Sequence, residues 1–161
     1  MKVAIIMGSA SDADKMEACI HILKDFGAEV TVRALSAHRA HKALEECVNE
    51  CNENGTDVII TAAGMAAALP GVVASMTVLP VIGVPLKAVA FDGLDALMSI
   101  VQMPSGVPVA TVAINGGKNA AYLALQIMGI KYPELSEKLK AFRKEQEDAC
   151  LKTDQDIRER Y

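Results

Sequence analysis

The sequence contains no tryptophan and few other aromatic residues, with three phenylalanines and three tyrosines among its 161 residues. Hydrophobic residues nevertheless make up 52% of the chain. Alanine, valine, isoleucine, leucine and methionine must therefore build the core. A domain of this length buries roughly 70% of the surface that its unfolded chain exposes. It needs no disulfide or metal to fold, and we expect residues 1–161 to form a single domain.

The chain also lacks a basic segment, a disulfide framework and a long apolar run. Its formal net charge of −4 argues against nucleic acid as a partner. The four cysteines follow no framework spacing, which is typical of a reduced cytoplasmic protein. No stretch reaches the ~20 apolar residues of a membrane-spanning helix. We therefore expect a cytoplasmic protein with neither a nucleic-acid nor a membrane partner.

Short apolar runs alternate with amphipathic segments along the chain. The apolar runs predict strands at Val3–Met7, Glu29–Arg33, Asp57–Ala62, Val81–Val84 and Val107–Ala113. The amphipathic segments predict helices at Asp12–Phe26, Lys42–Asn54, Leu69–Ser75, Asp92–Val101 and Lys118–Met128. Strands that alternate with helices predict an α/β fold, in which a parallel sheet carries helices on both faces.

A further charged helix is predicted after Pro133, at about residues 133–150. Leu135, Leu139 and Phe142 place one apolar stripe on it. Since the other helices already cover the sheet, we expect this helix to pack on a neighbouring subunit. The polar residues after Leu151 are expected to fray.

The loop after the first predicted strand reads Met-Gly-Ser-Ala-Ser-Asp, residues 7–12. It has neither the Gly-Lys-Ser/Thr of a nucleotide P-loop nor the three glycines of a dinucleotide site. Backbone N–H groups at such a helix start bind phosphate, whereas Asp12 would repel it and suits a helix cap or a partner for sugar hydroxyls. Ser9, Ser11 and Asp12 can equally all be helix-capping residues, so both interpretations stay open.

Residues 36–39, Ser-Ala-His-Arg, follow the second predicted strand. An imidazole can carry a proton near neutral pH, and a guanidinium can bind a phosphate or carboxylate. Ligands of open parallel sheets bind at the carboxyl ends of the strands, where His38 and Arg39 are placed. The alternative is that His38 is a loop imidazole satisfied by hydrogen bonds.

Two other patterns allow structural and functional interpretations. Cys47 and Cys51, with His38 and His41, suggest zinc, but both cysteines belong to the apolar stripe of a helix and no second ligand pair follows. We therefore expect no metal. The small residues between Ala62 and Gly71 let the backbone approach a ligand, or allow tight helix packing.

Together with Pro80–Pro85 and Ser99–Gly106, these segments closely resemble the class I N5-carboxyaminoimidazole ribonucleotide mutases of bacterial purine biosynthesis. The resemblance runs from Val3 to about Glu147. It implies a flavodoxin-like three-layer αβα sandwich with a five-stranded parallel sheet and an extra C-terminal helix. It further implies a homo-octamer, a small ribonucleotide substrate and no cofactor.

The activity that the resemblance implies moves a carboxyl group from an exocyclic nitrogen to ring carbon C4 in IMP biosynthesis. His38 would be the catalytic acid and base. The substrate-binding residues that it implies are Gly8, Ser9, Ser11, Asp12, Ser36, Ala37, Arg39, Gly64, Met65, Ala66 and Leu69.

Ala68 departs from the pattern of that family. Class I members usually carry histidine before Leu-Pro-Gly, whereas related carboxylases that use free CO2 carry alanine there. Arg39 and Pro80–Pro85, however, follow class I. Two alternatives therefore remain: a carboxylase that uses CO2 directly, and a nucleotide- or flavin-binding module without catalysis.

Overall fold

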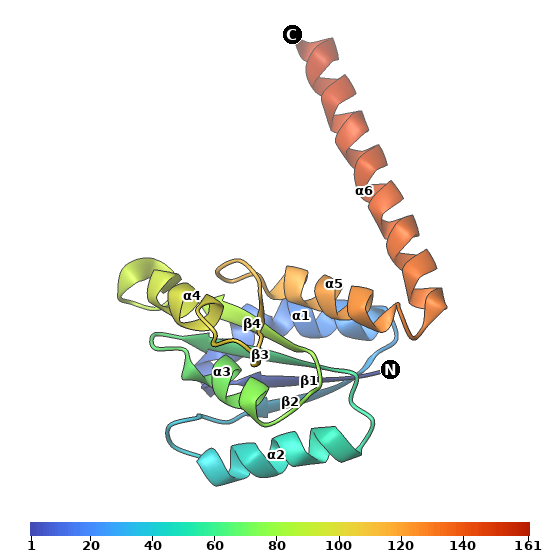
Figure 1. Cartoon of the computed structure of the whole chain (residues 1–161). Helices are drawn as coiled ribbons and strands as arrows, with labels where there is room; N and C mark the ends of the chain where they lie inside the picture. The colour runs from blue at the N-terminus through green and yellow to red at the C-terminus, as the bar shows by residue number, and fades with distance from the viewer.

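The structure is a computed structural model that describes residues 1–161. One parallel sheet runs through its centre in the strand order β2-β1-β3-β4-β5 (Figure 1). Its strands are β1 (Lys2–Met7), β2 (Glu29–Ala34), β3 (Val58–Gly64), β4 (Val81–Leu86) and β5 (Ala110–Thr111). This order is the one found in flavodoxin-like doubly wound folds.

Helices cover both faces of the sheet. The helices are α1 (Ala13–Asp25), α2 (His41–Glu53), α3 (Ala68–Ser75), α4 (Leu94–Val101) and α5 (Gly117–Met128), and two short 3₁₀ turns are η1 (Ala10–Asp12) and η2 (Phe91–Gly93). Buried residues of α1 and α5 form one core layer with the sheet, and those of α2, α3 and α4 form the other. The predicted three-layer αβα sandwich is thereby confirmed.

β1 shows why the apolar runs predicted strands. Val3, Ile5 and Met7 belong to the core on the α1 and α5 side, whereas Ala4 and Ile6 belong to the core on the opposite side. Successive side chains of a strand point to opposite faces, so a strand between two helical layers must be apolar throughout.

The predicted apolar stripes of the helices match the buried faces. In α2, all four predicted residues, Leu44, Cys47, Val48 and Cys51, are buried. In α1, Met16, Cys19 and Leu23 are buried and Ile20 is half-buried. None of the helices combines the length and the apolar character that crossing a bilayer requires.

The fifth strand is much shorter than the sequence predicted. Only Ala110 and Thr111 pair with β4, through Ile82 and Gly83, in place of the expected Val107–Ala113. Pro108 has no N–H to donate to a neighbouring strand. β5 also forms an edge of the sheet, so the residues on either side of its two paired positions lack a second strand to hold them.

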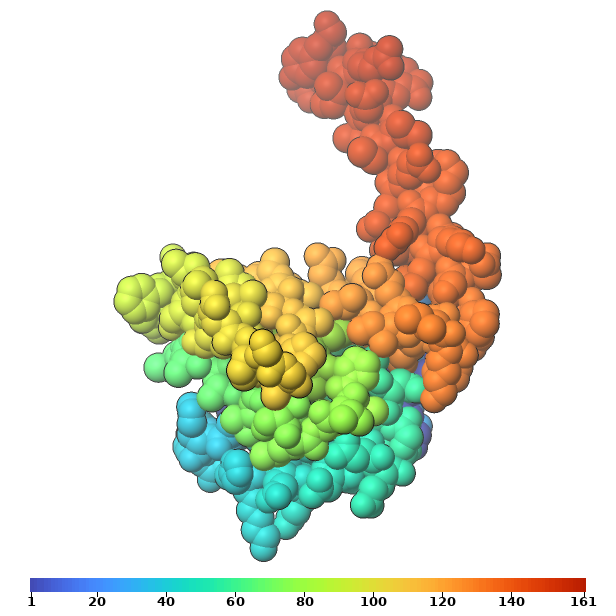
Figure 2. Space-filling model, viewed as in Figure 1, coloured from blue at the N-terminus to red at the C-terminus, as the bar shows by residue number.

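The C-terminal helix α6 (Pro133–Arg160) leaves the body of the molecule and projects away from it (Figures 1 and 2). Its predicted stripe packs within its own chain: Leu135 and Leu139 are buried, and the Phe142 ring stacks on Tyr122 with centroids 4.8 Å apart. The start of α6 thus has a place on its own subunit, because α5 and the end of α1 offer it an apolar surface, while its packing on a neighbouring subunit stays a prediction. The rest of α6 remains without a partner in the chain.

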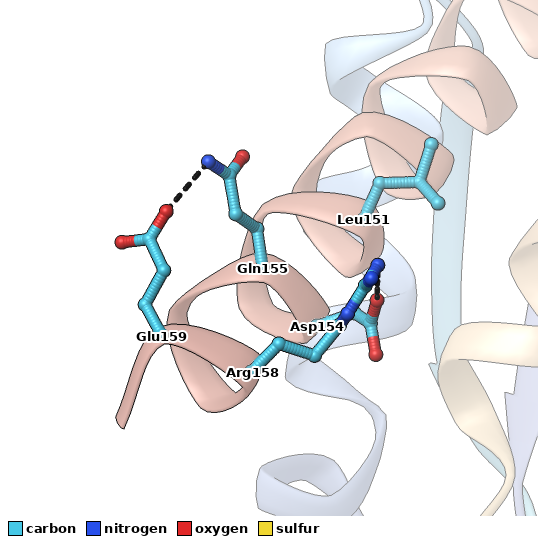
Figure 3. A pocket seen from close by; sticks show the side chains of 5 residues that line it. All are labelled: Leu151, Asp154, Gln155, Arg158 and Glu159. Carbon is cyan, nitrogen blue, oxygen red and sulfur yellow. Dashed lines mark hydrogen bonds and ion pairs between the residues drawn. The ribbon is translucent and has the colours of Figure 1, made fainter. Parts of the chain in front are cut away.

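The end of α6 does not fray as predicted, since the helix continues past Leu151 to Arg160. Side chains four residues apart support it: Gln155 donates to Glu159 at 2.8 Å, and Arg158 lies 3.8 Å from Asp154 (Figure 3). Such pairs stabilise exposed helices, and no glycine or proline interrupts this segment. The hollow in Figure 3 is lined by this one helix alone.

Candidate functional site

The three loops singled out in the sequence lie side by side at one end of the sheet. Met7, the last residue of β1, pairs with Ala34 of β2 and with Ala62 of β3. Gly64, the last residue of β3, pairs with Leu86 of β4. The loops that follow these strands therefore leave the sheet together, at the end opposite the N-terminus (Figure 1).

The polar residues of the loop after β1 have different roles. Ser9 caps η1, since its Oγ accepts hydrogen bonds from the N–H and the hydroxyl of Ser11 at 3.3 and 3.0 Å. Asp12 precedes α1, but its side chain makes no capping hydrogen bond. The capping interpretation thus holds for Ser9, whereas the Asp12 carboxylate remains available to a ligand. Gly8 is fixed by its N–H, which donates to the Ala62 carbonyl at 3.0 Å.

Asp12 is half-buried, and this burial changes the pKa of its carboxyl group. Burial raises the pKa of Asp12 above its ordinary value, while the charge of Lys15 and the backbone N–H of Ser9 act in the opposite direction. When ionised, a carboxylate offers only acceptors. The arrangement therefore suits hydroxyl donors.

A compact turn presents His38 and Arg39. The Ser36 carbonyl accepts from the N–H groups of Arg39 at 3.2 Å and Ala40 at 2.8 Å, and Ala37 packs against the core. His38 is exposed, and its imidazole has no hydrogen-bond partner in the chain. No hydrogen bond within the chain therefore accounts for the position of His38, and its imidazole faces solvent.

Arg39 makes one long hydrogen bond through its side chain, from Nε to Ser36 Oγ at 3.4 Å. Its terminal guanidinium nitrogens make no hydrogen bond within the chain. A planar group with paired donors that are not already used can bind a phosphate through two oxygens. Ser36 holds the start of this side chain.

The loop after β3 has an unusual backbone. Met65 and Ala67 both adopt left-handed conformations, with φ of 56° and 39°. Met65 and Ala66 are exposed. A Cβ on Gly64 would lie 3.1 Å from the Leu86 carbonyl oxygen, so the close approach of β4 favours glycine there.

Leu69 lies differently from the other residues of this loop. Its side chain is 3% exposed and belongs to the core between α2, α3 and α4. Leu69 stands in the first turn of α3, which has no side-chain cap. A contact between Leu69 and a ligand would thus involve its backbone N–H, one of the unpaired donors at the start of the helix.

Sequence reasoning missed Lys15, Lys87 and Asn115, which all lie around the same strand ends. Lys15 Nζ donates to the Lys87 carbonyl at 2.8 Å, and the Lys87 N–H donates to Asn115 Oδ1 at 3.0 Å. Lys15 and Lys87 are 72 residues apart. The available signals were weak: Lys15 stands three residues after Asp12, and Asn115 begins an Asn-Gly turn.

The cysteines form a structural pair. Cys47 and Cys51 are 4% and 5% exposed and lie in the core. A hydrogen bond from Cys51 and the charge of Arg33 lower the pKa of Cys47 to about 7. No three His, Cys, Asp or Glu side chains are grouped in a way that could hold a metal ion.

Comparisons with known proteins find related sequences over most of the chain. Residues 2–149 match the family model described as AIR carboxylase. The N5-carboxyaminoimidazole ribonucleotide mutase of Pyrococcus horikoshii is 56% identical over 143 residues, which cover 89% of this chain and 81% of that protein. The phosphoribosylaminoimidazole carboxylase of Saccharomyces cerevisiae is 49% identical over 149 residues, and this chain spans about a quarter of its length.

Among solved structures, Treponema denticola PurE superposes with a TM-score of 0.87 at 31% identity. The superposition covers 94% of each chain. The similarity therefore extends over almost the whole molecule, including most of α6.

Proposed function

Because the chain belongs to the AIR carboxylase family, we propose that it is an N5-carboxyaminoimidazole ribonucleotide mutase of purine biosynthesis, acting on the route to IMP. One observation of the structure supports this most strongly: an unpartnered imidazole, His38, beside Arg39 on a loop adjoining that of Asp12. A proton carrier, a phosphate-binding group and a hydroxyl acceptor then meet at one end of the sheet.

His38 serves both proton transfers. The carboxyl group leaves the exocyclic nitrogen as CO2, and the nitrogen takes a proton from the His38 imidazolium. Ring carbon C4 then attacks the CO2 held in the site, and the neutral imidazole removes the C4 proton. The imidazole ends in its starting form, so the net reaction is an isomerisation.

Arg39 binds the phosphate of the substrate, and Asp12 accepts hydrogen bonds from the ribose hydroxyls. Ser9, Ser11 and Ser36 add hydroxyls around them. The free N–H groups at the start of α3 and the small residues after Gly64 hold the carboxyl group and the released CO2. No residue in this role is a nucleophile that CO2 would carboxylate.

A carboxylase that takes free CO2 is the second candidate, and Ala68 is the observation that favours it. The two activities are distinguished by the substrate that each one uses. The purified protein is incubated with the N-carboxylated substrate, and separately with aminoimidazole ribonucleotide and bicarbonate. We expect rapid formation of the C4-carboxylated product from the first substrate. Product from the second mixture alone would identify a carboxylase.

We infer that the working enzyme is a homo-octamer of single-domain subunits. An apolar stripe on η2 and α4 is exposed to solvent, with Phe91 at 77%, Leu94 at 55%, Met98 at 48% and Val101 at 50%. Contiguous exposed apolar surface is a mark of protein interfaces. The unpartnered length of α6 is a second surface for a neighbouring subunit. All four cysteines are free thiols, which fits the reducing cytoplasm.

A further inference from the structure

The loop between β4 and η2, residues 87–90, is held through Lys87. The Lys87 carbonyl accepts from Lys15 Nζ at 2.8 Å, and its N–H donates to Asn115 Oδ1 at 3.0 Å. Its ammonium forms an ion pair with Asp92 Oδ1 at 2.8 Å. Lys87 thus joins α1, the turn before α5 and η2 through all three of its polar groups.

The segment that follows Lys87 depends on these contacts. Phe91, Asp92 and Gly93 are consecutive left-handed residues, with φ of 56°, 51° and 92°. This conformation is unfavourable for Phe91 and Asp92, so it persists only where surrounding contacts impose it. A Cβ on Gly93 would lie 2.8 Å from the Ile114 side chain, which shows how closely η2 is packed at this point.

Lys15 also acts on the candidate site itself. It stands one helical turn after Asp12, and its positive charge opposes the effect of burial on that carboxylate. On the opposite side, the Gly64 loop packs on the β4 end, where a Cβ on Gly64 would be 3.5 Å from the Ala88 Cβ. One ammonium therefore connects the Asp12 side of the site with the loop that borders its Gly64 side.

We propose that Lys15 is a positioning residue for substrate binding: its ammonium fastens the β4–η2 loop, which borders the Gly64 side of the site, to α1 on the Asp12 side. This inference rests on the proposed function. Lys15 acts through Lys87 and touches no reacting atom, so its loss should impair binding of the substrate much more than the chemical step.

The kinetic test compares Lys15→Met, Lys15→Arg and the control Lys24→Met. Lys24 lies on the same helix, and its ammonium makes no ion pair or hydrogen bond. We expect Lys15→Met to raise KM about tenfold with kcat within about twofold, the size of a lost charge-assisted hydrogen bond. Lys15→Arg keeps charge and donors and should restore most of the affinity. An unchanged KM in Lys15→Met, or an equal defect in Lys15→Arg, would overturn the proposal.

Hydrogen exchange in the free protein tests, without any enzymatic reaction, whether Lys15 holds the β4–η2 loop against α1. We expect the hydrogen-bonded amides at the two ends of this segment, those of Lys87 and Leu94, to exchange about tenfold faster in Lys15→Met than in the wild type or in Lys24→Met. Unchanged exchange would refute the role of Lys15 in holding this loop, even if the enzyme proved not to be a mutase. A wild type that turns over the carboxylated substrate, beside a Lys15→Met variant with normal KM and exchange, would refute this inference alone.

Discussion

The Asp57 carboxylate, whose side chain is 8% exposed, accepts a hydrogen bond from the Lys131 ammonium at 2.8 Å. The same carboxylate accepts from the Lys2 N–H at 2.9 Å and from the Tyr132 hydroxyl at 3.3 Å. Asp57 precedes β3, Lys2 begins β1, and Lys131 and Tyr132 form the turn from α5 into α6. One carboxylate therefore fixes the base of α6 against the sheet.

We expect Asp57→Asn to lower the free energy of unfolding by about 1 kcal/mol, a modest value because Lys131 is exposed and screened. Burial acts to raise the pKa of Asp57, but the hydrogen bonds from Lys131 and the Lys2 N–H hold it below its ordinary value. The stabilisation is therefore complete above the unfolded pKa of about 3.9 and is lost as pH falls through the lower folded pKa.

Urea unfolding of both proteins from pH 7 to pH 3 measures this prediction. The difference between wild type and variant should stay constant down to about pH 4 and then shrink. A difference that does not change with pH would mean that the charge of Asp57 contributes nothing.

His38→Asn tests the proton carrier. An amide can hold the loop but cannot transfer a proton at neutral pH, so we expect kcat to fall by about two to four orders of magnitude. Substrate affinity and thermal stability should change little, because the imidazole is exposed and unpartnered. Steady-state kinetics and calorimetry measure both effects. Turnover close to that of the wild type would remove His38 from the mechanism.

Arg39→Ala and Arg39→Lys test the phosphate contact. We expect Arg39→Ala to weaken binding of aminoimidazole ribonucleotide by tenfold or more, by about the strength of a charge-assisted pair. Lysine keeps the charge without the paired donors, so its affinity should fall between the two. Calorimetry measures all three proteins. Equal affinity in Arg39→Ala and wild type would contradict the assignment.

Met98→Glu tests assembly. Met98 lies in the middle of the exposed stripe on α4, so a charge there should leave the subunit folded and disrupt the octamer. Val78→Glu is the control, because Val78 is fully exposed and lies outside the stripe. Light scattering of the three proteins gives their masses. An intact chain that is monomeric would contradict the octamer.

The sequence predicted those parts of the molecule in which neighbours along the chain decide the structure. The spacing of apolar residues along the chain predicts the buried face of α2 and the burial of β1 on both sides. The position of the His38 loop is predicted by the strand that precedes it. β5 was predicted too long because its length depends on pairing with β4, which local residues do not reveal.

Contacts between distant segments account for the rest. The Lys15–Lys87 hydrogen bond joins residues that only the folded sheet brings together, so no local sequence pattern predicts it. The loop after β1 was ambiguous for a similar reason: the residue types allowed both Ser9 and Asp12 to act as caps. Only the backbone geometry shows that Ser9 caps η1 and that Asp12 makes no capping hydrogen bond.

Ala68 lies at the start of α3, where the proposed mechanism places the released CO2. It is the half-buried first residue of α3, directly after the left-handed Ala67. The α3 N-terminus has no side-chain cap. We expect water to take the place of the missing side chain beside the N-terminal N–H groups of α3, whereas an imidazole there could donate to a carboxyl group.

We therefore expect the natural protein to act as a mutase that loses part of its CO2, and Ala68→His to lose less. His38 alone can serve both proton transfers while the ribonucleotide stays bound, so the second imidazole is not needed for bond making. Both products are followed from the N-carboxylated substrate: the C4-carboxylated ribonucleotide and free aminoimidazole ribonucleotide. The ratio of free to carboxylated product should fall in Ala68→His. If the natural protein gave only free aminoimidazole ribonucleotide from this substrate, yet carboxylated that compound with CO2, it would be a carboxylase.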